Sequence, residues 1–252
     1  RPLSMDSSGQ LVASILSKKV AAGSTHLLID IPVGDSAKIH DTQEALKLRK
    51  LFEYIGDLFA LHIEVVITDG SQPIGNGIGP ALEARDVQQV LSNKKDAPAD
   101  LREKSLRLAG RILEFDPDVR GGQGYAIARD ILESGRAFEK MQAIISAQGT
   151  QQKKEYQAPL EFAVTAKNDG YVHAIDNLKI ANIASLAGAP IEKSAGIYLS
   201  KKVGEQVIKG DTLFTIYACF KSEFEFAKQL ADEGCVYIIE EKPPTKNDNY
   251  FI

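Results

Sequence analysis

The strongest constraint on the fold is an alternation of two hydrophobic periodicities between residues 11 and 67. Apolar residues recur at helical spacing over 11–20 and 45–59, and short apolar or alternating runs occupy 27–31 and 61–67. Asp41, with Glu44 three residues later, forms a variant of the capping box that starts the second helix. The order helix, strand, helix, strand is typical of an α/β unit with a parallel sheet.

The first helix presents two chemically different sides. Residues 6–8 (Asp-Ser-Ser) provide a capping signal, and the buried stripe consists of Leu11, Val12, Ile15, Leu16 and Val20. Ser14 and Lys18 are one turn apart on another side, so a hydroxyl and an ammonium point the same way. From this pattern alone, an ordinary solvated helix face is the commoner explanation.

Two loops follow the expected strands, where ligands of parallel α/β folds usually bind. Lys38 belongs to the first loop, and the second contains the glycine-rich segment 75–80. The glycines are spaced G-x-G-x-G, without a following Lys-Ser or Lys-Thr pair, which disfavours a dinucleotide site or a P-loop. This segment is either a tight turn that allows close backbone packing or a loop that lines a site. Pro80 starts the next helix, 81–91.

The second half of the chain changes character after a polar linker. Helical stretches at 101–115, 125–134 and 137–146 precede it, and the linker itself is 151–157. Short strands between Gly and Asp turns follow, with one helix at 222–231, which predicts a compact β-rich domain. The expected domains are 1–150, part of an α/β domain, and 158–252, a β-rich C-terminal domain.

Composition excludes several classes of function. A net charge of −4 leaves no basic excess for nucleic-acid phosphates, and no apolar run reaches the length of a membrane span. Cys219 and Cys235 are too few for a disulfide framework, so we read them as small buried hydrophobes. With no signal peptide visible, we expect a cytoplasmic protein without nucleic-acid or membrane partners. The start at Arg1, without Met, suggests a fragment of a longer polypeptide.

Several familiar sites find no support in the sequence. The histidines, His26, His40, His62 and His173, stand at no metal-ligand spacing, so we expect no metal site. There is no G-x-S-x-G nucleophile elbow. Residues 203–213 have the glycine and valine spacing of biotinyl and lipoyl carriers. The lysine to be modified would be Lys179, which opens a helical run instead of a hairpin tip, so a carrier is disfavoured.

Six segments of the sequence belong together: residues 4–19 with Gln-Leu-Val-Ala-Ser-Ile-Leu-Ser-Lys-Lys, residues 22–34, residues 72–83, and the C-terminal segments 169–172, 187–189 and 203–213. They resemble the thymidine and pyrimidine-nucleoside phosphorylase family. The resemblance covers nearly the whole chain. Residues 31–34 (Ile-Pro-Val-Gly) and 36–38 (Ser-Ala-Lys) look more like the branch that includes AMP phosphorylases and putative thymidine phosphorylases. Pro32 and Ser36 depart from the Lys-Val-Gly-x-Gly-Ala loop of the better-known bacterial enzymes.

The resemblance implies a fold and a site. The fold class would be α/β, a mixed sheet flanked by helices of the nucleoside phosphorylase class II type, followed by a small α+β barrel-like domain. The family's helical domain and its glycine-rich phosphate-binding segment have no match here, which supports the fragment interpretation. By resemblance Asp6 is the catalytic proton donor, Ser14 and Lys38 bind substrate, and Lys18 matches a base-binding lysine of the thymidine enzymes.

The implied reaction is phosphorolysis of thymidine, giving thymine and 2-deoxyribose 1-phosphate. Inorganic phosphate would be the co-substrate, no cofactor is needed, and a homodimer or larger homo-oligomer would form through the missing helical domain. AMP is the alternative substrate, and a nucleoside-binding module without turnover is the alternative class. A free aspartate is ionised at neutral pH, so either burial raises the pKa of Asp6 or this residue only orients the base.

Overall fold

The computed structural model describes residues 8–119, 121–149 and 158–244. The chain divides into two compact units. The first holds the described residues up to Ser71 and those between Arg111 and Gly124. The second holds those from Gln72 to Gly110 and the described residues from Tyr125 onward. The domain limits expected from composition stay a prediction.

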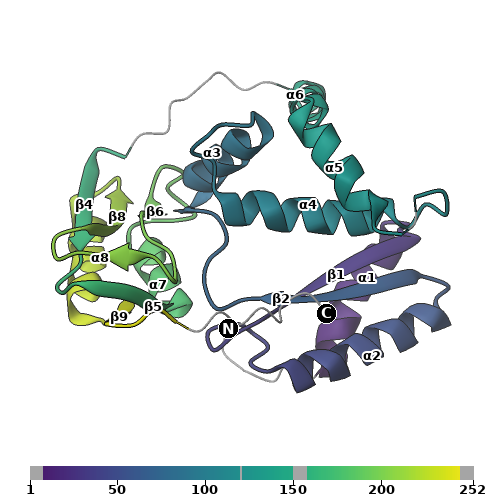
Figure 1. Ribbon diagram of the computed structural model, residues 1–252, viewed down its shortest axis with the longest axis horizontal. Coiled ribbons are helices and arrows are strands. Elements are labelled where there is room, and N and C mark those ends of the chain that lie inside the picture. Colours follow the sequence, from purple (N-terminus) through teal and green to yellow (C-terminus); the bar gives the residue numbers. More distant parts are fainter. Residues whose placement is uncertain (1–7, 120, 150–157, 245–252) are drawn as a thin grey trace. The chain divides into compact units, whose positions relative to one another are not determined.

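The first unit is the expected α/β unit. Helix α1 (Ser8–Ala21) leads to strand β1 (His26–Val33), and helix α2 (Thr42–Leu58) leads to strand β2 (His62–Asp69). The two strands pair in parallel with His26 opposite His62 and Val33 opposite Asp69 (Figure 1). Both helices and both strands share one hydrophobic core: Val12, Leu16, Leu27, Ile31, Val33, Ile39, Ala45, Leu48, Phe52, Leu61, Val65 and Ile67. The alternation of periodicities therefore predicted the four elements of this unit correctly, but Val20, expected in the buried stripe of the first helix, is exposed.

The start of α2 shows how the local sequence specifies an element. Asp41 is the N-cap residue, and its carboxylate accepts a hydrogen bond of 2.8 Å from the backbone N–H of Glu44. This bond satisfies one of the amide groups that a helix start leaves without an intrahelical partner. Ala45, Leu48 and Phe52 then form the buried stripe. The predicted cap is confirmed.

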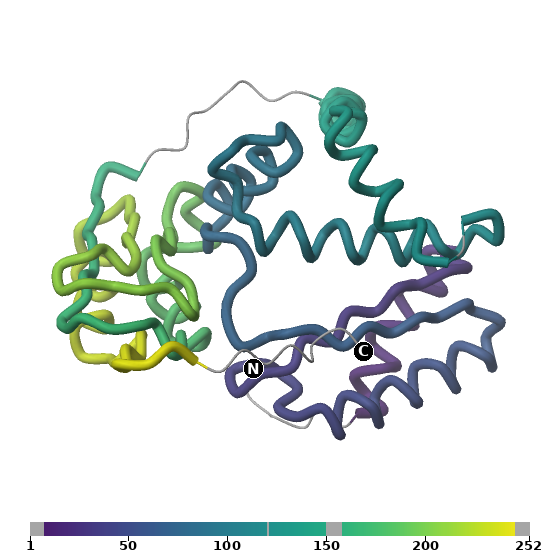
Figure 2. Tube along the Cα trace, viewed as in Figure 1, coloured from purple at the N-terminus to yellow at the C-terminus, as the bar shows by residue number. Residues whose placement is uncertain are grey.

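Four helices follow β2 along the chain. They are α3 (Pro80–Leu91), α4 (Ala99–Leu113), α5 (Gln123–Glu133) and α6 (Arg136–Ala147). Pro80 stands at the first position of α3, where its missing N–H costs nothing. The tube in Figure 2 follows the chain from β2 through the glycine-rich segment into these helices. The helical stretches expected from the sequence lie within a few residues of these limits.

The C-terminal part contains small antiparallel sheets. In the described residues, β3 (Gly77–Ile78), β6 (Gly196–Leu199), β8 (Thr212–Ala218) and β4 (Leu160–Thr165) form one sheet in that order. A second consists of β7 (Gln206–Val207), β5 (Gly170–Ile175) and β9 (Tyr237–Glu240). Helices α7 (Asn177–Leu186) and α8 (Lys221–Glu233) pack with these sheets around one core, in which Val172, Ile183, Phe214 and Ile216 are fully buried.

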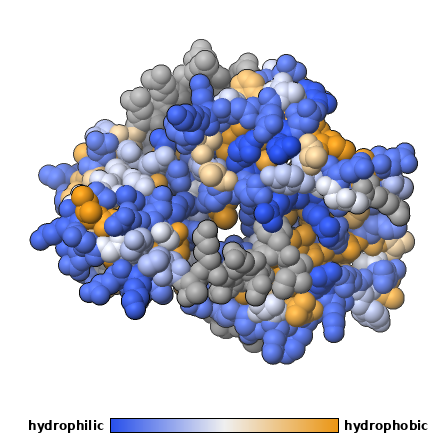
Figure 3. Space-filling model, viewed as in Figure 1, coloured by the Kyte–Doolittle hydropathy of each residue, from blue (hydrophilic) through white to orange (hydrophobic). Residues whose placement is uncertain are grey.

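The structure is a mixed α/β fold with helices and several small sheets, as the sequence predicted at that level. Strand β3 was not predicted, because 75–80 had been expected to form only a loop. Its partner β6 is far away in the sequence, so no local pattern signals the pairing. Within the described residues no helix is long and apolar enough to cross a membrane. The visible face is mostly hydrophilic, with scattered apolar patches (Figure 3).

Candidate functional site

Helix α1 carries two of the predicted site residues on its exposed side. Val12 and Leu16 are buried in the core, whereas Ser14 and Lys18 are exposed, one turn apart. The carbonyl oxygen of Ser14 accepts a long hydrogen bond of 3.5 Å from the hydroxyl of Ser17. The Ser14 hydroxyl and the Lys18 ammonium thus share an accessible face. Asp6, the predicted proton donor, lies outside the described residues.

Lys38 lies in the short loop that follows β1. The N–H of Ala37 donates to the carbonyl of Gly34 at 2.9 Å, which closes a turn. The chain then returns to the strand, since the N–H of Gly34 donates to Ile39 at 3.2 Å and Ile39 bridges to Val33. Ile39 is buried, so the loop is fixed on both sides of an exposed Lys38. The sequence predicted this position correctly, at the carboxyl end of a parallel strand.

The carboxyl ends of β1 and β2 approach each other closely beside this loop. The N–H of Gly70 donates to the carbonyl of Val33 at 2.8 Å. A Cβ atom on Gly34 would lie 2.7 Å from the backbone carbon and oxygen of Gly70. The carboxylate of Asp69 accepts a hydrogen bond of 2.8 Å from the N–H of Ser71, which shapes the exit of β2. This end of the sheet is therefore a backbone-lined surface next to a lysine, suited to a polar ligand.

A polar pair of a buried threonine and a half-buried aspartate lies in the sheet just before this edge. The hydroxyl of Thr68 donates to the carboxylate of Asp30 at 2.6 Å, and Thr68 is 1% exposed. Sequence reasoning missed Asp30, Thr68, Asp69 and Gly70 as part of the candidate site. The signal that could have found them is the parallel register, which places the residues after both strands at one edge.

The glycine-rich segment has a structural role inside the second unit. A Cβ on Gly77 would lie 2.5 Å from the backbone of Leu82, and one on Gly79 would lie 2.4 Å from the carbonyl oxygen of Ala195. Both positions require glycine, because neighbouring backbone occupies the space of a side chain. This agrees with the tight-packing interpretation of the segment.

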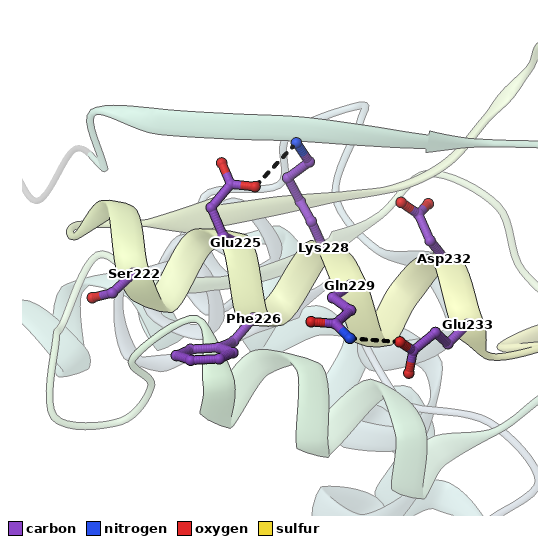
Figure 4. A pocket seen from close by; sticks show the side chains of 7 residues that line it. All are labelled: Ser222, Glu225, Phe226, Lys228, Gln229, Asp232 and Glu233. Carbon is purple, nitrogen blue, oxygen red and sulfur yellow. Dashed lines mark hydrogen bonds and ion pairs between the residues drawn. The ribbon is translucent and has the colours of Figure 1, made fainter.

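Two hollows of the second unit contain none of the predicted site residues. One of about 640 Å³ runs along α8 between Ser222 and Glu233. Its lining comes from this one helix, and Glu225 and Lys228 pair on one side while Phe226 points elsewhere (Figure 4). The other, of about 460 Å³, lies among β4, β8, β9 and the end of α8. Neither shows convergent polar groups that would define a reaction site.

The lysine and cysteines that the sequence singled out lie in the C-terminal part of the chain. Lys179 lies in the first turn of α7, its N–H bonded to the capping Asp176 at 3.0 Å, and not at a hairpin tip. The ammonium of Lys179 contacts the carbonyl of Cys235 at 3.2 Å. Cys235 is exposed and Cys219 half-buried, so the expectation that both are buried is wrong. In the described part of the chain, no three His, Cys, Asp or Glu side chains gather as metal ligands would.

Comparison with known proteins assigns a class to the C-terminal part. Residues 171–237 match the family model of the pyrimidine nucleoside phosphorylase C-terminal domain. This match covers β5 to the start of β9, including both α7 and α8. This part of the chain is therefore similar to a pyrimidine nucleoside phosphorylase C-terminal domain.

Curated relatives extend the likeness to nearly the whole chain. It is 61% identical over 230 residues to a Methylococcus capsulatus protein named "Putative thymidine phosphorylase", over 91% of this chain and 45% of that protein. A protein of the same name from Albidiferax ferrireducens is 57% identical over 242 residues, 95% of this chain and 46% of the relative. The chain spans about half the length of the curated relatives it matches. The family resemblance seen in the sequence is confirmed.

Proposed function

We propose that this chain supplies the nucleoside-binding part of a phosphorylase that cleaves thymidine with inorganic phosphate, giving thymine and 2-deoxyribose 1-phosphate. The observation that carries the proposal is 61% identity to a relative named "Putative thymidine phosphorylase". The backbone-lined end of the β1–β2 sheet, with Lys38 beside it, supports a polar ligand at that edge. The class II nucleoside phosphorylase arrangement, with its helical domain, is part of the same proposal.

The chemistry assigns a role to each proposed residue. An oxygen of phosphate attacks the sugar C1′, the C1′–N bond breaks, and its electron pair leaves on the base. Negative charge develops on the base, so a nearby donor lowers the barrier. Ser14 and Lys18 would hold the base from the exposed face of α1, and Lys38 would bind a ligand oxygen. Asp6 would give the base its proton or a hydrogen bond.

The proposal extends to the co-substrate, the cellular location and the assembly of the enzyme. Phosphate is a co-substrate, and the reaction needs no cofactor or resident metal, because charge on the leaving base is met by side-chain donors. The enzyme works in the cytoplasm, in the salvage of nucleotides. It assembles as a homodimer or larger homo-oligomer through the helical domain.

The testing experiment is a product assay on the full-length polypeptide that contains this chain. Thymidine, uridine and AMP are each incubated with phosphate, and the released base is measured by chromatography. Release of thymine at the highest kcat/KM is expected. Preferred release of adenine from AMP would replace thymidine by a nucleotide substrate, as residues 31–34 and 36–38 would allow. No release of base from any of the three, in a folded protein, would overturn the proposed function.

Assays of the isolated chain distinguish catalytic turnover from nucleoside binding. We expect no release of base from this chain alone. Phosphate binding in the proposed reaction requires the glycine-rich segment of the family, and this sequence has no match to it. Measurable phosphorolysis by the isolated chain would contradict that expectation. Nucleoside binding by full-length protein without turnover would favour the binding-module alternative.

A further inference from the structure

Lys202 reaches from the C-terminal part back to the glycine-rich segment. Its ammonium donates to the carbonyl of Pro73 at 2.6 Å, to the carbonyl of Gly75, and to the carboxylate of Asp100 at 2.9 Å. An ammonium has three N–H donors, and these described acceptors match that number. The side chain is only 18% exposed, so little water competes for these bonds. Lys202 therefore fixes two carbonyl groups of one loop and one carboxylate of α4.

Asp86 holds the same segment from the other side. This residue of α3 is 1% exposed, and one carboxylate oxygen accepts the N–H groups of both Asn76 and Gly77 at 2.6 Å. Hydrogen bonds to an ionised acceptor are stronger than those between neutral groups. Two carbonyls of residues 72–79 are thus bound by the half-buried ammonium of Lys202, and two of their amides by the buried carboxylate of Asp86.

The β-strand pairing completes the attachment. Gly77 and Ile78 pair with Tyr198 and Ile197 in antiparallel register. Backbone bonds extend this pairing on one side, where the N–H of Leu199 donates to Asn76 at 2.7 Å. The side-chain oxygen of Gln72 accepts the N–H of Val203 at 3.0 Å. Residues 72–79 are therefore bound to the C-terminal part along their whole length.

Residues 72–79 follow directly after the end of β2 that forms the candidate site. Residues 69–71 form the turn by which the chain leaves β2 at the candidate site. Gln72 is the next residue. We propose that Lys202 is a positioning residue for that site: by fixing 72–79 it holds the exit of β2 in its ligand-binding conformation. The inference rests on the proposed function. In it, Lys202 of the C-terminal part acts on the site through residues 72–79 and does not contact the substrate.

A role limited to stabilising the fold makes a different prediction. Loss of Lys202 would then lower the free energy of unfolding while leaving the active fraction of the enzyme with normal kinetics. A positioning role changes the kinetics of fully folded enzyme, because small displacements near a reacting ligand slow its reaction strongly. In either role the variant takes the ammonium away from two carbonyls and from Asp100, whose carboxylate keeps the N–H groups of Gly75 and Leu101, so stability alone cannot separate the two roles.

The experiment compares Lys202→Met with the matched control Lys201→Met in the full-length enzyme. The neighbouring Lys201 bonds only within the C-terminal part, to the carbonyl of Gln206 and to Asp211, in the contacts described for its side chain. Steady-state kinetics with thymidine are measured well below the melting temperature of each variant. Amide hydrogen exchange of a peptide covering 72–79 is measured in parallel. If Lys202→Met does not fold, Asp100→Asn takes its place, because it removes the negative charge that pairs with Lys202.

For Lys202→Met we expect kcat/KM to fall by about tenfold to a hundredfold, with faster exchange confined to the 72–79 peptide. Lys201→Met should stay within about twofold of wild type, a change too small to indicate displacement near the ligand. Unchanged kcat/KM in folded Lys202→Met, or an equal loss in both variants, would overturn the inference. Inactive wild-type enzyme would instead refute the proposed function. In that case, equal exchange of 72–79 in wild type and Lys202→Met would also refute the attachment.

Discussion

Thr68 donates its hydroxyl hydrogen to the carboxylate of Asp30 at 2.6 Å, between the two parallel strands of the first unit. Thr68 is fully buried, and the bond lies close to the edge where both strands end. A buried hydrogen bond to a carboxylate is costly to break on one side only, because the remaining group keeps its desolvation penalty. This bond therefore contributes to the stability of the sheet close to the candidate site.

Thr68→Val tests the contribution of this bond to stability. Valine has nearly the shape of threonine but lacks the hydroxyl, so the variant should lose about 1–3 kcal/mol in the free energy of unfolding. Urea denaturation followed by circular dichroism measures the loss. Thr165→Val, at an exposed position at the end of β4, is the control and should change stability little. Equal stability of Thr68→Val and wild type would show that the bond contributes nothing.

Gly34→Ala tests the close approach of the strand ends. The new methyl group would lie 2.7 Å from the backbone of Gly70 and 2.9 Å from the N of Ser71, so the two strand ends must separate. We expect a loss of about 1–3 kcal/mol in stability and weaker thymidine binding by the full-length enzyme. Calorimetric titration measures the binding.

Gly23→Ala is the matched control, since its methyl group meets open space and only the left-handed backbone conformation opposes it. This control should lose about 1 kcal/mol of stability and keep its affinity for thymidine. Normal affinity in folded Gly34→Ala would place the ligand elsewhere.

Lys38→Met tests the proposed ligand contact at the end of β1. If the ammonium binds a substrate oxygen, its loss should raise KM for thymidine by about tenfold or more, because bonds to charged groups contribute about 1.5–3 kcal/mol. Lys19→Met, an exposed lysine of α1 next to Lys18, is the control. Steady-state kinetics that are the same in both variants would remove Lys38 from the site.

Asp6→Asn tests the proposed proton donor in the full-length enzyme. Asparagine keeps the size and one oxygen of the side chain but cannot supply an acidic proton. We expect most of kcat to be lost while nucleoside binding persists, as measured by product release and by calorimetric titration. Near-normal turnover would refute the role.

Glu103 predicts a pH dependence of stability. Burial raises the pKa of its carboxyl, but hydrogen bonds from Arg107 and from the hydroxyl of Tyr125 outweigh this and bring the pKa below its ordinary 4.5. The folded protein then binds fewer protons than the unfolded chain. The stabilisation is therefore present above the ordinary pKa and is lost as the pH falls through the lowered one.

Glu103→Gln should weaken this acid dependence. Between pH 7 and pH 3 its free energy of unfolding should fall less than that of wild type, as measured by urea denaturation at each pH. Glu139→Gln, a change in the first turn of α6, serves as the control and should follow wild type. A wild-type dependence in Glu103→Gln would contradict the prediction.

The sequence by itself determined the local elements and the family. Periodicity located α1, β1, α2 and β2, and the pair Asp41 and Glu44 marked the start of α2, because such signals act within a few residues. The motifs that resembled a nucleoside phosphorylase indicated the family that the relatives confirm. The roles of Asp6, Ser14, Lys18 and Lys38 stay predictions.

Only the tertiary structure decided what joins distant segments. The pairing of β3 with β6, the bonds from Lys202 to Pro73 and Gly75, and the pair Thr68 and Asp30 link residues far apart in the chain. The physical reason is that hydrogen bonds and backbone packing depend on distance in space, which a short stretch of sequence does not encode. The glycines at 77 and 79 illustrate this, since the backbone that excludes a side chain there belongs to α3 and to the residue before β6.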